Sequence, residues 1–137
     1  METNFKIITS TEIEYNERLI DLHNNFDFIY RNCIFETKKI TLHFIKSNGH
    51  WVNNNEYDEL FFIFDEYNYL KQIEPENEFI DEDSCLRDIT FFDSKLRDEN
   101  HGIIKQMYPH KDDDIIFSFM SQRIIRVNCK KIILIPK

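Results

Sequence analysis

The sequence contains no alanine, only two glycines and only three prolines among its 137 residues. Such a low glycine and proline content excludes collagen-like and low-complexity chains. The two isolated glycines, Gly49 and Gly102, cannot form the glycine-rich loop that cradles a nucleotide phosphate. Leu and Met together number 11, whereas Ile and Phe together number 34. Because Ile and Phe suit a pleated sheet better than a helix, the composition predicts a sheet-dominated protein.

No apolar run approaches the ~20 residues that a membrane-spanning helix needs, and acidic residues interrupt the first thirty positions. The sequence therefore lacks the apolar core of a secretory signal. Its three cysteines, Cys33, Cys85 and Cys129, are widely spaced and form no CxxC pair, a pattern typical of free thiols in a reducing compartment. We therefore expect a cytoplasmic protein.

The length of 137 residues is typical of one domain. An apolar fraction of 42% and a charged fraction of 31% are values of a globular chain. No internal repeat and no linker-like composition divides the sequence. We therefore expect a single domain that spans residues 1–137.

Residues Thr11 to His23 are predicted to form a helix. Thr11 and Glu14 have the spacing of a capping box, and apolar residues recur close to a period of 3.6. These apolar residues are Ile13, Tyr15, Leu19, Ile20 and Leu22. Asn24 and Asn25 would end the helix.

Most of the remaining sequence is predicted to form strands. The expected strands are Phe26–Phe35 and Lys39–Lys46 as a hairpin, Leu60–Phe64, Leu86–Phe92, Ile115–Phe119, Arg123–Asn128 and Lys131–Ile135. Residues 93–108 show no clear pattern apart from a short helix near 93–100. The run Leu60–Phe64 would have apolar groups on both faces, which is typical of a doubly covered strand. The predicted fold is α+β, a mainly antiparallel sheet of five to seven strands with one N-terminal helix packed against it.

Four basic residues alternate with apolar ones in the last predicted strands, and this pattern is typical of a solvated sheet face or a protected edge. These residues are Arg123, Arg126, Lys130 and Lys131. Glu74–Ser84 is expected to be a long loop, and Ser47–Asn55 a polar loop that carries Trp51.

No motif identifies a reaction, a metal site or a cofactor site. His110, Asp112 and Asp114 come closest to a ligand cluster, but their spacing also suits a solvated turn. Five histidines and three cysteines permit many pairings without indicating one. His43 lies in a predicted strand, where a structural role is common, and His50 lies beside Trp51 on the polar loop, where binding is more plausible. We therefore expect a non-enzymatic protein without a metal or cofactor.

The net charge of −8 disfavours binding to nucleic acid or to an anionic membrane. The excess negative charge lies between residues 56 and 83, where eleven acidic residues accompany Lys71 alone. The predicted partner-binding residues are Glu56, Tyr57, Asp58, Glu59, Asp65, Glu66, Tyr67, Glu74, Glu76, Glu78, Asp81, Glu82 and Asp83. We expect them to converge into one docking site for a basic protein, since such a field steers a partner and tyrosines anchor interfaces. Ordinary solvation of charged loops is the alternative interpretation.

In its general layout the chain resembles the small acidic immunity proteins that bacteria pair with secreted or contact-delivered toxins. The resemblance is carried by the passages Leu22–Phe28, Lys39–Phe44 and Ser121–Val127. It implies a cytoplasmic, non-enzymatic protein that binds one toxin and blocks its active site. Many such toxins are nucleases, whose basic substrate clefts would suit an acidic surface.

Two other functions are compatible with the sequence. A curved sheet could enclose an apolar ligand pocket lined by phenylalanines, as in a small-ligand carrier or an enzyme. The phenylalanines concerned are Phe61, Phe62, Phe64, Phe91, Phe92, Phe117 and Phe119. An oligomeric structural protein could instead use Trp51 and the tyrosines as contacts. The sequence does not determine the oligomeric state.

Overall fold

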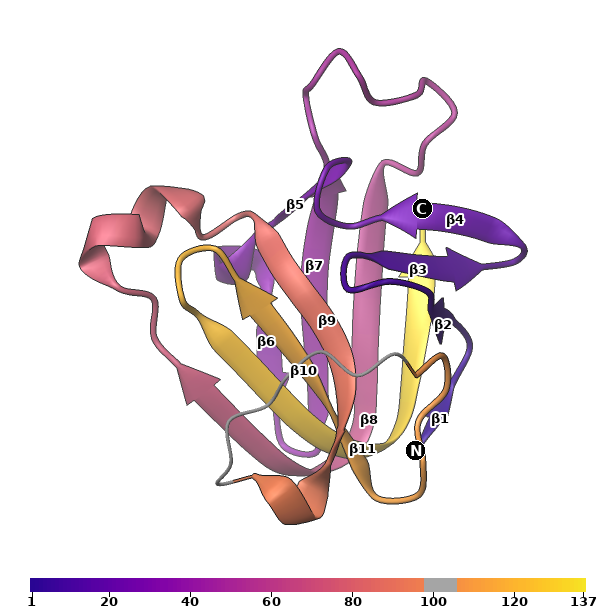
Figure 1. The fold of residues 1–137 in the computed structure, drawn as a ribbon, viewed down its shortest axis with the longest axis vertical. Coiled ribbons are helices and arrows are strands. Elements are labelled where there is room, and N and C mark those ends of the chain that lie inside the picture. Colours follow the sequence, from indigo (N-terminus) through magenta and orange to yellow (C-terminus); the bar gives the residue numbers. More distant parts are fainter. Residues whose placement is uncertain (98–105) are drawn as a thin grey trace.

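The computed structural model describes residues 1–97 and 106–137 (Figure 1). Its strands are β1 (Glu2–Thr3), β2 (Lys6–Ile7), β3 (Glu12–Tyr15), β4 (Arg18–Asp21), β5 (Phe26–Phe28), β6 (Ile34–Glu36), β7 (Lys39–Lys46), β8 (Glu59–Ile73), β9 (Leu86–Asp93), β10 (Asp113–Phe119) and β11 (Ile124–Pro136). Three short 3-10 helices, η1 (Tyr30–Asn32), η2 (Asn77–Glu82) and η3 (Ser94–Leu96), lie in the connections.

Eight of these strands form one sheet. Its main path runs β5-β7-β8-β11-β10-β9, and every pair along it is antiparallel. β6 also pairs with β7, and β1 pairs with β11 in parallel. A second, antiparallel sheet has the order β2-β3-β4. It packs on the same core, because Ile7, Ile13 and Ile20 belong to the main apolar cluster.

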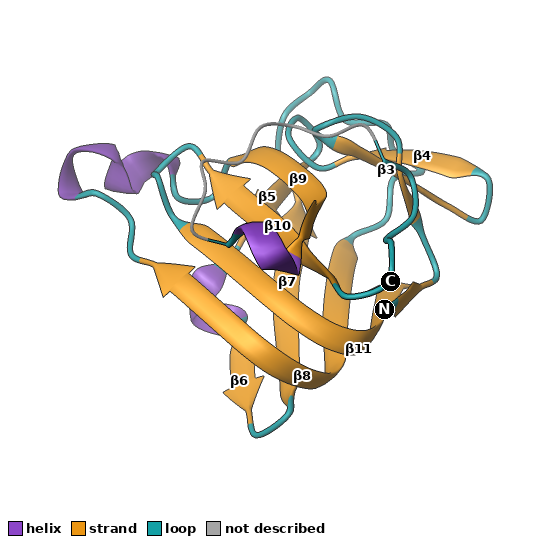
Figure 2. Cartoon of the chain, turned by 60° about the horizontal axis from the view of Figure 1, so that its bottom comes forward, coloured by secondary structure: helices purple, strands orange, loops and turns teal. Residues whose placement is uncertain are grey.

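The large sheet curls until its outer strands approach each other, which gives a near-closed cylinder (Figure 2). The Phe28 amide of β5 donates to the carbonyl of Ser84, just before β9, at 2.8 Å. The Phe28 ring stacks on Phe119 of β10 with the ring centroids 4.3 Å apart. Phe28 thus joins the two ends of the strand order.

The curl depends on a corner in the ribbon formed by β8 and β11. Asp65 and Glu66 on β8, and Lys130 and Lys131 opposite them on β11, are consecutive exposed residues, and they interrupt the alternation that precedes Asp65 and follows Lys131. The register shifts by one residue close by, and Glu66 has a φ of 51°, in the left-handed region. Such irregularities bend and twist a strand pair. Alternate side chains of a strand face the core, and at this corner the alternation shifts by one residue.

The interior of the cylinder is filled by aromatic rings. Phe44, Phe62, Phe64 and Phe117 are fully buried, and their ring centroids lie between 5.4 and 6.4 Å apart. Tilted and edge-on contacts of this kind suit the quadrupoles of the rings. The cylinder is a packed core.

The predicted α+β fold is wrong, because residues 11–23 form the β3-β4 hairpin instead of a helix. Ile13 and Ile20 pair directly across the hairpin, and both are fully buried. Asn16 and Glu17 both have positive φ, as a two-residue type I′ turn requires. Ile13 and Ile20 are seven residues apart, which is about two turns of a helix and is also the spacing of this pair across the hairpin. The periodicity was therefore compatible with a helix and with a hairpin. In the described residues the longest helical element is the six-residue η2.

Other expectations differ in detail. β6 and β7 form the expected hairpin, but η1 separates β5 from β6. The run Leu60–Phe64 is not doubly buried, since its side chains alternate between buried and partly exposed. The two strands predicted after residue 123 form one continuous strand. Of the short helix predicted for residues 93–100, Ser94–Leu96 is a 3-10 turn, and residues 98–100 lie outside the described part of the chain, as does the rest of 98–105.

The outer face of β10 and β11 holds a buried carboxylate. Asp114 accepts hydrogen bonds from Arg97 at 2.7 and 2.8 Å, from Arg126 at 2.6 Å and from Asn128 at 2.9 Å. The Arg97 guanidinium also lies 3.6 Å from the centroid of the Tyr69 ring. Burial alone raises the pKa of Asp114, but these hydrogen bonds lower it more, so the pKa lies below its usual value. Arg97 belongs to the segment after β9, and this pairing fixes that segment to the sheet.

Replacing Asp114 by Ala should lower the free energy of unfolding at neutral pH by about 3–5 kcal/mol, because two arginines lose their shared partner. The lowered pKa makes the contribution of the carboxylate pH-dependent. The contribution is complete above about pH 4, the value at which an unfolded Asp titrates, and is lost as the pH falls toward the folded pKa. Urea unfolding of the wild type and of Asp114→Ala between pH 7 and pH 2 checks this expectation. A stability gap that stays constant over this range would contradict it.

Candidate functional site

The acidic residues singled out in the sequence separate into three groups along β8 and do not converge on one site (Figure 1). β8 has 15 residues, each of which advances the chain by about 3.3 Å. Glu56–Glu59 therefore lie at one end of the strand, Asp65–Tyr67 at its corner, and Glu74–Asp83 beyond its other end. The expected single docking site is not formed, and partner binding by these residues stays a prediction.

The group at the start of β8 is neutralised by neighbouring basic residues. The structure contains the ion pairs Glu56–Arg18 at 3.3 Å and Asp58–Lys46 at 3.1 Å, and Glu59 lies 3.0 Å from Nε2 of His43. Tyr57 is half-buried beneath Arg18, with 4.4 Å between the guanidinium carbon and the ring centroid. Two of the three carboxylates of this group are therefore paired with a cation, and the third is hydrogen-bonded to an imidazole.

The group at the corner faces the lysines of β11. Glu66 lies 3.5 Å from Lys130, and Asp65 is in register with Lys131. The Tyr67 hydroxyl donates to the carbonyl of Glu36 at 3.1 Å. These charges complement each other across the corner and form part of the fold.

The third group differs, because most of its carboxylates are exposed and unpaired. Among residues 1–97 and 106–137, no ion pair or side-chain hydrogen bond engages five of them. They are Glu74, Glu76, Glu78, Asp81 and Glu82. Ile73 and Ile80, two exposed apolar side chains, lie within the same stretch. We call residues 73–82 the acidic loop. It projects from the cylinder and carries η2, at the left edge of Figure 1.

A buried ion pair anchors the acidic loop to the sheet. Asp83 accepts hydrogen bonds from Arg123 at 2.9 and 3.1 Å and from the Ser121 hydroxyl at 2.6 Å. The guanidinium carbon of Arg123 lies 3.7 Å from the centroid of the Tyr30 ring, and the Tyr30 hydroxyl donates to Gln72. Burial lowers the pKa of Arg123, but the hydrogen bonds that it donates to Asp83 raise it more, so Arg123 stays charged. This contact fixes the position where the loop returns to the sheet.

An open groove of about 380 Å³ separates the acidic loop from η1. Ile80 and Asp81 line it on one side, and Tyr30 and Arg31 on the other. Asp83 also lines the groove, but its carboxylate is already bound to Arg123. The groove therefore offers one free carboxylate and an apolar contact, which suits docking better than proton transfer between a catalytic pair.

Arg123 and Tyr30 were missed by the sequence analysis. The alternation of basic and apolar residues predicted exposed cations, but Arg123 and Arg126 are 4% and 3% exposed, and only Lys130 and Lys131 face solvent. A buried arginine needs a carboxylate partner. Nothing in the sequence spacing links residue 123 to Asp83, which lies 40 positions earlier.

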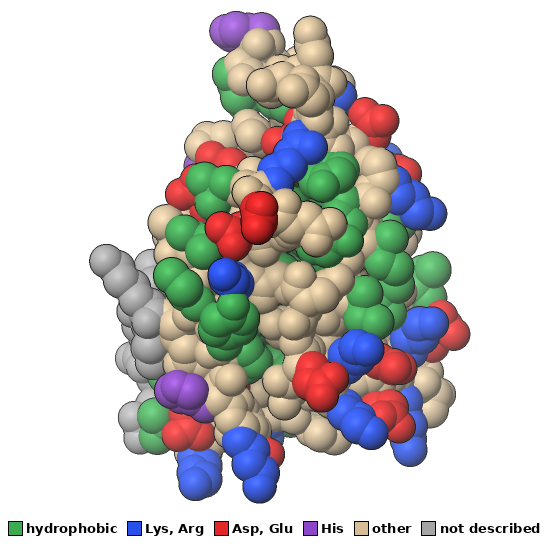
Figure 3. All heavy atoms as spheres, turned by 90° about the vertical axis from the view of Figure 1, so that its right-hand side faces the viewer, with side chains coloured by type: hydrophobic (Ala, Val, Ile, Leu, Met, Phe, Trp, Pro, Cys, Tyr) green, Lys and Arg blue, Asp and Glu red, His purple; other side chains and the backbone are tan. Residues whose placement is uncertain are grey.

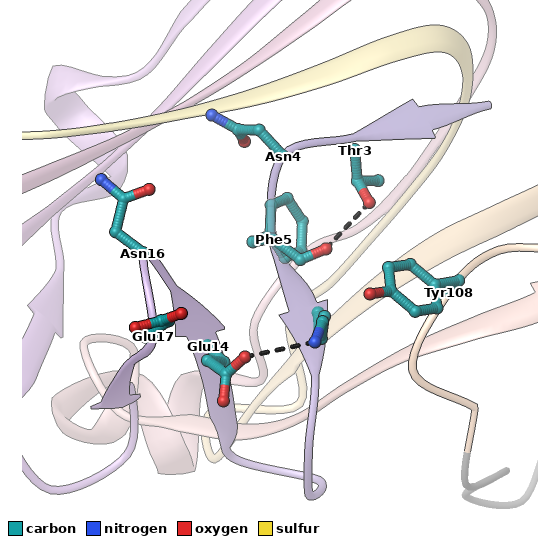
Figure 4. A pocket seen from close by; sticks show the side chains of 8 residues that line it. Thr3, Asn4, Phe5, Glu14, Asn16, Glu17 and Tyr108 are labelled. Atoms are coloured by element: carbon teal, nitrogen blue, oxygen red, sulfur yellow. Dashed lines mark hydrogen bonds and ion pairs between the residues drawn. The ribbon is translucent and has the colours of Figure 1, made fainter.

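A second groove, of about 350 Å³, lies between the first strands and Tyr108 (Figure 4). Lys6 forms an ion pair with Glu14 at 3.4 Å. Hydrogen bonds to Tyr108 and Glu14 raise the pKa of Lys6 above its usual value. These contacts favour the charged form of Lys6, which is not the form that acts as a nucleophile or base.

Within residues 1–97 and 106–137, Cys85 and His23 form a thiol–imidazole contact, with 3.4 Å between Sγ and Nδ1. The same Nδ1 lies 2.6 Å from the carbonyl of Leu86, and only a protonated nitrogen can bond to a carbonyl. This nitrogen is therefore not free to accept the thiol proton. Burial, followed by the charges of Asp27 and Glu82, raises the pKa of Cys85. The pair lacks the lowered thiol pKa of a nucleophile.

The other two thiols are also kept protonated. Burial raises the pKa of Cys33 to about 11 and that of Cys129 to about 12. All three cysteines are free. Each thus behaves as a small apolar group that is unreactive at neutral pH.

His43 has the structural role predicted for it. Its Nε2 lies 3.0 Å from Glu59, its Nδ1 lies 3.1 Å from the Asn32 amide, and its ring stacks on Phe61. Within the described residues no cluster of His, Cys, Asp and Glu could hold a metal ion. In the same part of the chain no helix is both long and apolar enough to span a membrane.

Comparison with known proteins provides no relative. No family model matches the chain, and neither a curated protein nor a solved structure matches it. The function of the acidic loop is therefore inferred from its own contacts and charges.

Replacing Asp83 by Ala should lower the free energy of unfolding by about 3 kcal/mol, because the buried Arg123 then has no counter-charge. Replacing the exposed neighbour Glu82 by Ala should change it by less than about 0.5 kcal/mol. Urea unfolding of the two variants provides a matched comparison, and equal losses would contradict the anchoring role of Asp83.

Proposed function

We propose that this protein is a non-enzymatic binding protein that docks on a basic protein surface through the acidic loop. The single observation that carries the proposal is the contrast between the three acidic groups. The carboxylates at the start and at the corner of β8 face basic partners, whereas five carboxylates of the acidic loop are exposed without one.

An unpaired acidic surface supports this proposal through its charge and its apolar content. Repulsion among neighbouring carboxylates costs stability, and a basic partner would relieve that repulsion and be steered toward the loop. Ile73 and Ile80, 41% and 49% exposed, provide apolar area that a partner would bury. Charge would then determine the rate of association, and the two isoleucines would add affinity.

The resemblance to immunity proteins suggests a specific partner. A cytoplasmic inhibitor of a toxin would insert an acidic loop into a basic substrate cleft, and a nuclease cleft has this charge. The packed core gives no support to the alternative of a ligand carrier, because Phe62, Phe64 and Phe117 fill the space in which such a ligand would lie.

The test compares two sets of charge reversals of equal size. One variant reverses Glu74, Glu76, Glu78 and Glu82 to Lys, and the control reverses four exposed acids elsewhere. The control positions are Glu2, Glu17, Glu36 and Asp112. If the neighbouring gene encodes a secreted protein, calorimetry with the C-terminal domain of that protein should show salt-sensitive binding, weakened at least about 100-fold by the first variant and less than about tenfold by the control.

Growth of cells that produce this toxin domain provides a second measurement. The wild type and the control should protect the cells, and the acidic-loop variant should not. Binding that is equally sensitive to both sets of reversals would assign the effect to net charge and contradict a specific role of the loop. A neighbouring domain that does not bind would contradict the immunity function.

A further inference from the structure

Trp51 is the most exposed of the large apolar side chains in the described residues, with 60% of its surface accessible. It lies on the connection between β7 and β8, which projects from the top of the cylinder in Figure 1. Burying a tryptophan is among the most favourable apolar contributions that a side chain can make. An exposed tryptophan on a projecting loop therefore needs a physical explanation.

The indole ring is held in one orientation. Its Nε1–H donates to the carbonyl of Asn24 at 2.8 Å. A Cβ on Gly49 would lie 2.2 to 2.4 Å from three adjacent atoms of the six-membered ring. Nearly equal distances to adjacent atoms place Gly49 over the face of the ring. One face of the indole is thus covered by Gly49, and the exposed area of Trp51 belongs to the rest of the ring.

The loop that carries Trp51 is itself ordered by hydrogen bonds. Val52 donates its amide to Gly49, and Glu56 donates its amide to the carbonyl of Asn53. The Asn53 side chain accepts the amide of Asn55 at 3.1 Å. A preformed loop loses little conformational entropy when a ligand binds.

The loop segment that carries Trp51 is polar, and Arg18 of β4 contacts it by donating a hydrogen bond to the carbonyl of Asn55. Residues 47–55 contain no charged residue, although the protein has a net charge of −8. Four of the nine residues are asparagines, and all four are exposed: Asn48, Asn53, Asn54 and Asn55. The His50 ring stands at 75° to the indole, with 5.5 Å between the centroids. Figure 3 shows the projecting tip mainly in tan, green and purple.

We propose that this loop is a binding site for a neutral saccharide. A pyranose ring has a face of C–H groups, which can pack on the free area of the indole, and a rim of hydroxyl groups, which can exchange hydrogen bonds with asparagine amides. A charged ligand would find no counter-charge on residues 47–55. An anchor for a protein partner is the other use of an exposed tryptophan, and the experiments below distinguish it from a saccharide site. The proposal does not depend on the acidic loop.

The sequence offers a direct probe, because Trp51 is its only tryptophan. Titration with maltohexaose, cellohexaose and the hexamer of N-acetylglucosamine should change the tryptophan emission with at least one of them. Calorimetry with that oligosaccharide should show binding that Trp51→Ala weakens at least about tenfold. A hexamer of galacturonate should bind more weakly than the neutral hexamers.

The Gly49→Ala variant tests whether binding depends on the orientation of the indole ring, because it keeps the tryptophan itself. The added methyl group must displace the indole, so this variant should weaken binding while it retains the tryptophan. Trp51→Tyr should retain part of the affinity. Both sites lie outside the apolar core, so thermal unfolding of the variants should match that of the wild type.

Two results would overturn the proposal. The first is the absence of any emission change or heat with all three neutral hexamers at millimolar concentration. The second is saccharide binding that Trp51→Ala leaves unchanged. If Trp51→Ala instead weakens binding of the basic protein partner, Trp51 belongs to the protein interface and the saccharide site is rejected. The acidic-loop variant should bind saccharide normally, so failure of one proposal does not decide the other.

Discussion

The corner in the β8-β11 ribbon is the feature on which the rest of the structure depends. A long antiparallel ribbon without irregularity twists gradually, and the outer strands of the sheet would then diverge. At the corner the inward-facing side changes on both strands, and the ribbon folds back over the core (Figure 2). The stack of Phe28 on Phe119 requires this closure, since β5 is one end of the strand order and β10 lies next to the other end. The opposite charges on the two strands cover the backbone at the position where the ladder is disturbed.

The same strand explains why a net charge of −8 does not produce one negative surface. The acids in and beside β8 lie from one end of the cylinder to the other, and Glu56, Asp58 and Glu66 form ion pairs with local partners. Two buried arginines need carboxylates, because an unpaired buried cation costs several kcal/mol. Asp83 pairs with Arg123, and Asp114 pairs with Arg126. The carboxylates that remain unpaired in this region are therefore those that form no stabilising ion pair within the fold.

The sequence predicted the strands well where alternation was regular and confined to one element. β7, β9 and β10 fall within or close to the expected ranges because their inward residues repeat every second position. It failed at β3 and β4, where a two-residue turn placed Ile13 and Ile20 at a separation that also suits a helix. The turn residues Asn16 and Glu17 lack the glycine that usually marks a type I′ turn.

Two features of the site could not be predicted because they depend on contacts between distant residues. The corner uses Glu66 in the left-handed region without a glycine, so no local residue indicated it. The anchor of Asp83 on Arg123 depends on the order of strands in the sheet. Composition revealed the excess of acids, but only the fold determines which acids meet a base.

The two connections that flank β8 carry the polar groups to which we assign the two proposed binding roles. The outer face of β10 and β11 is occupied by the hydrogen bonds of Asp114, and the interior is filled by phenylalanines. One connection, between β7 and β8, is uncharged and aromatic, and the other, between β8 and β9, is acidic. A rigid strand with a corner separates them, so no contact is shared and substitutions in one should add to those in the other. This separation lets one small sheet present two surfaces of different chemistry, each built on a loop whose ends are fixed by the same strand.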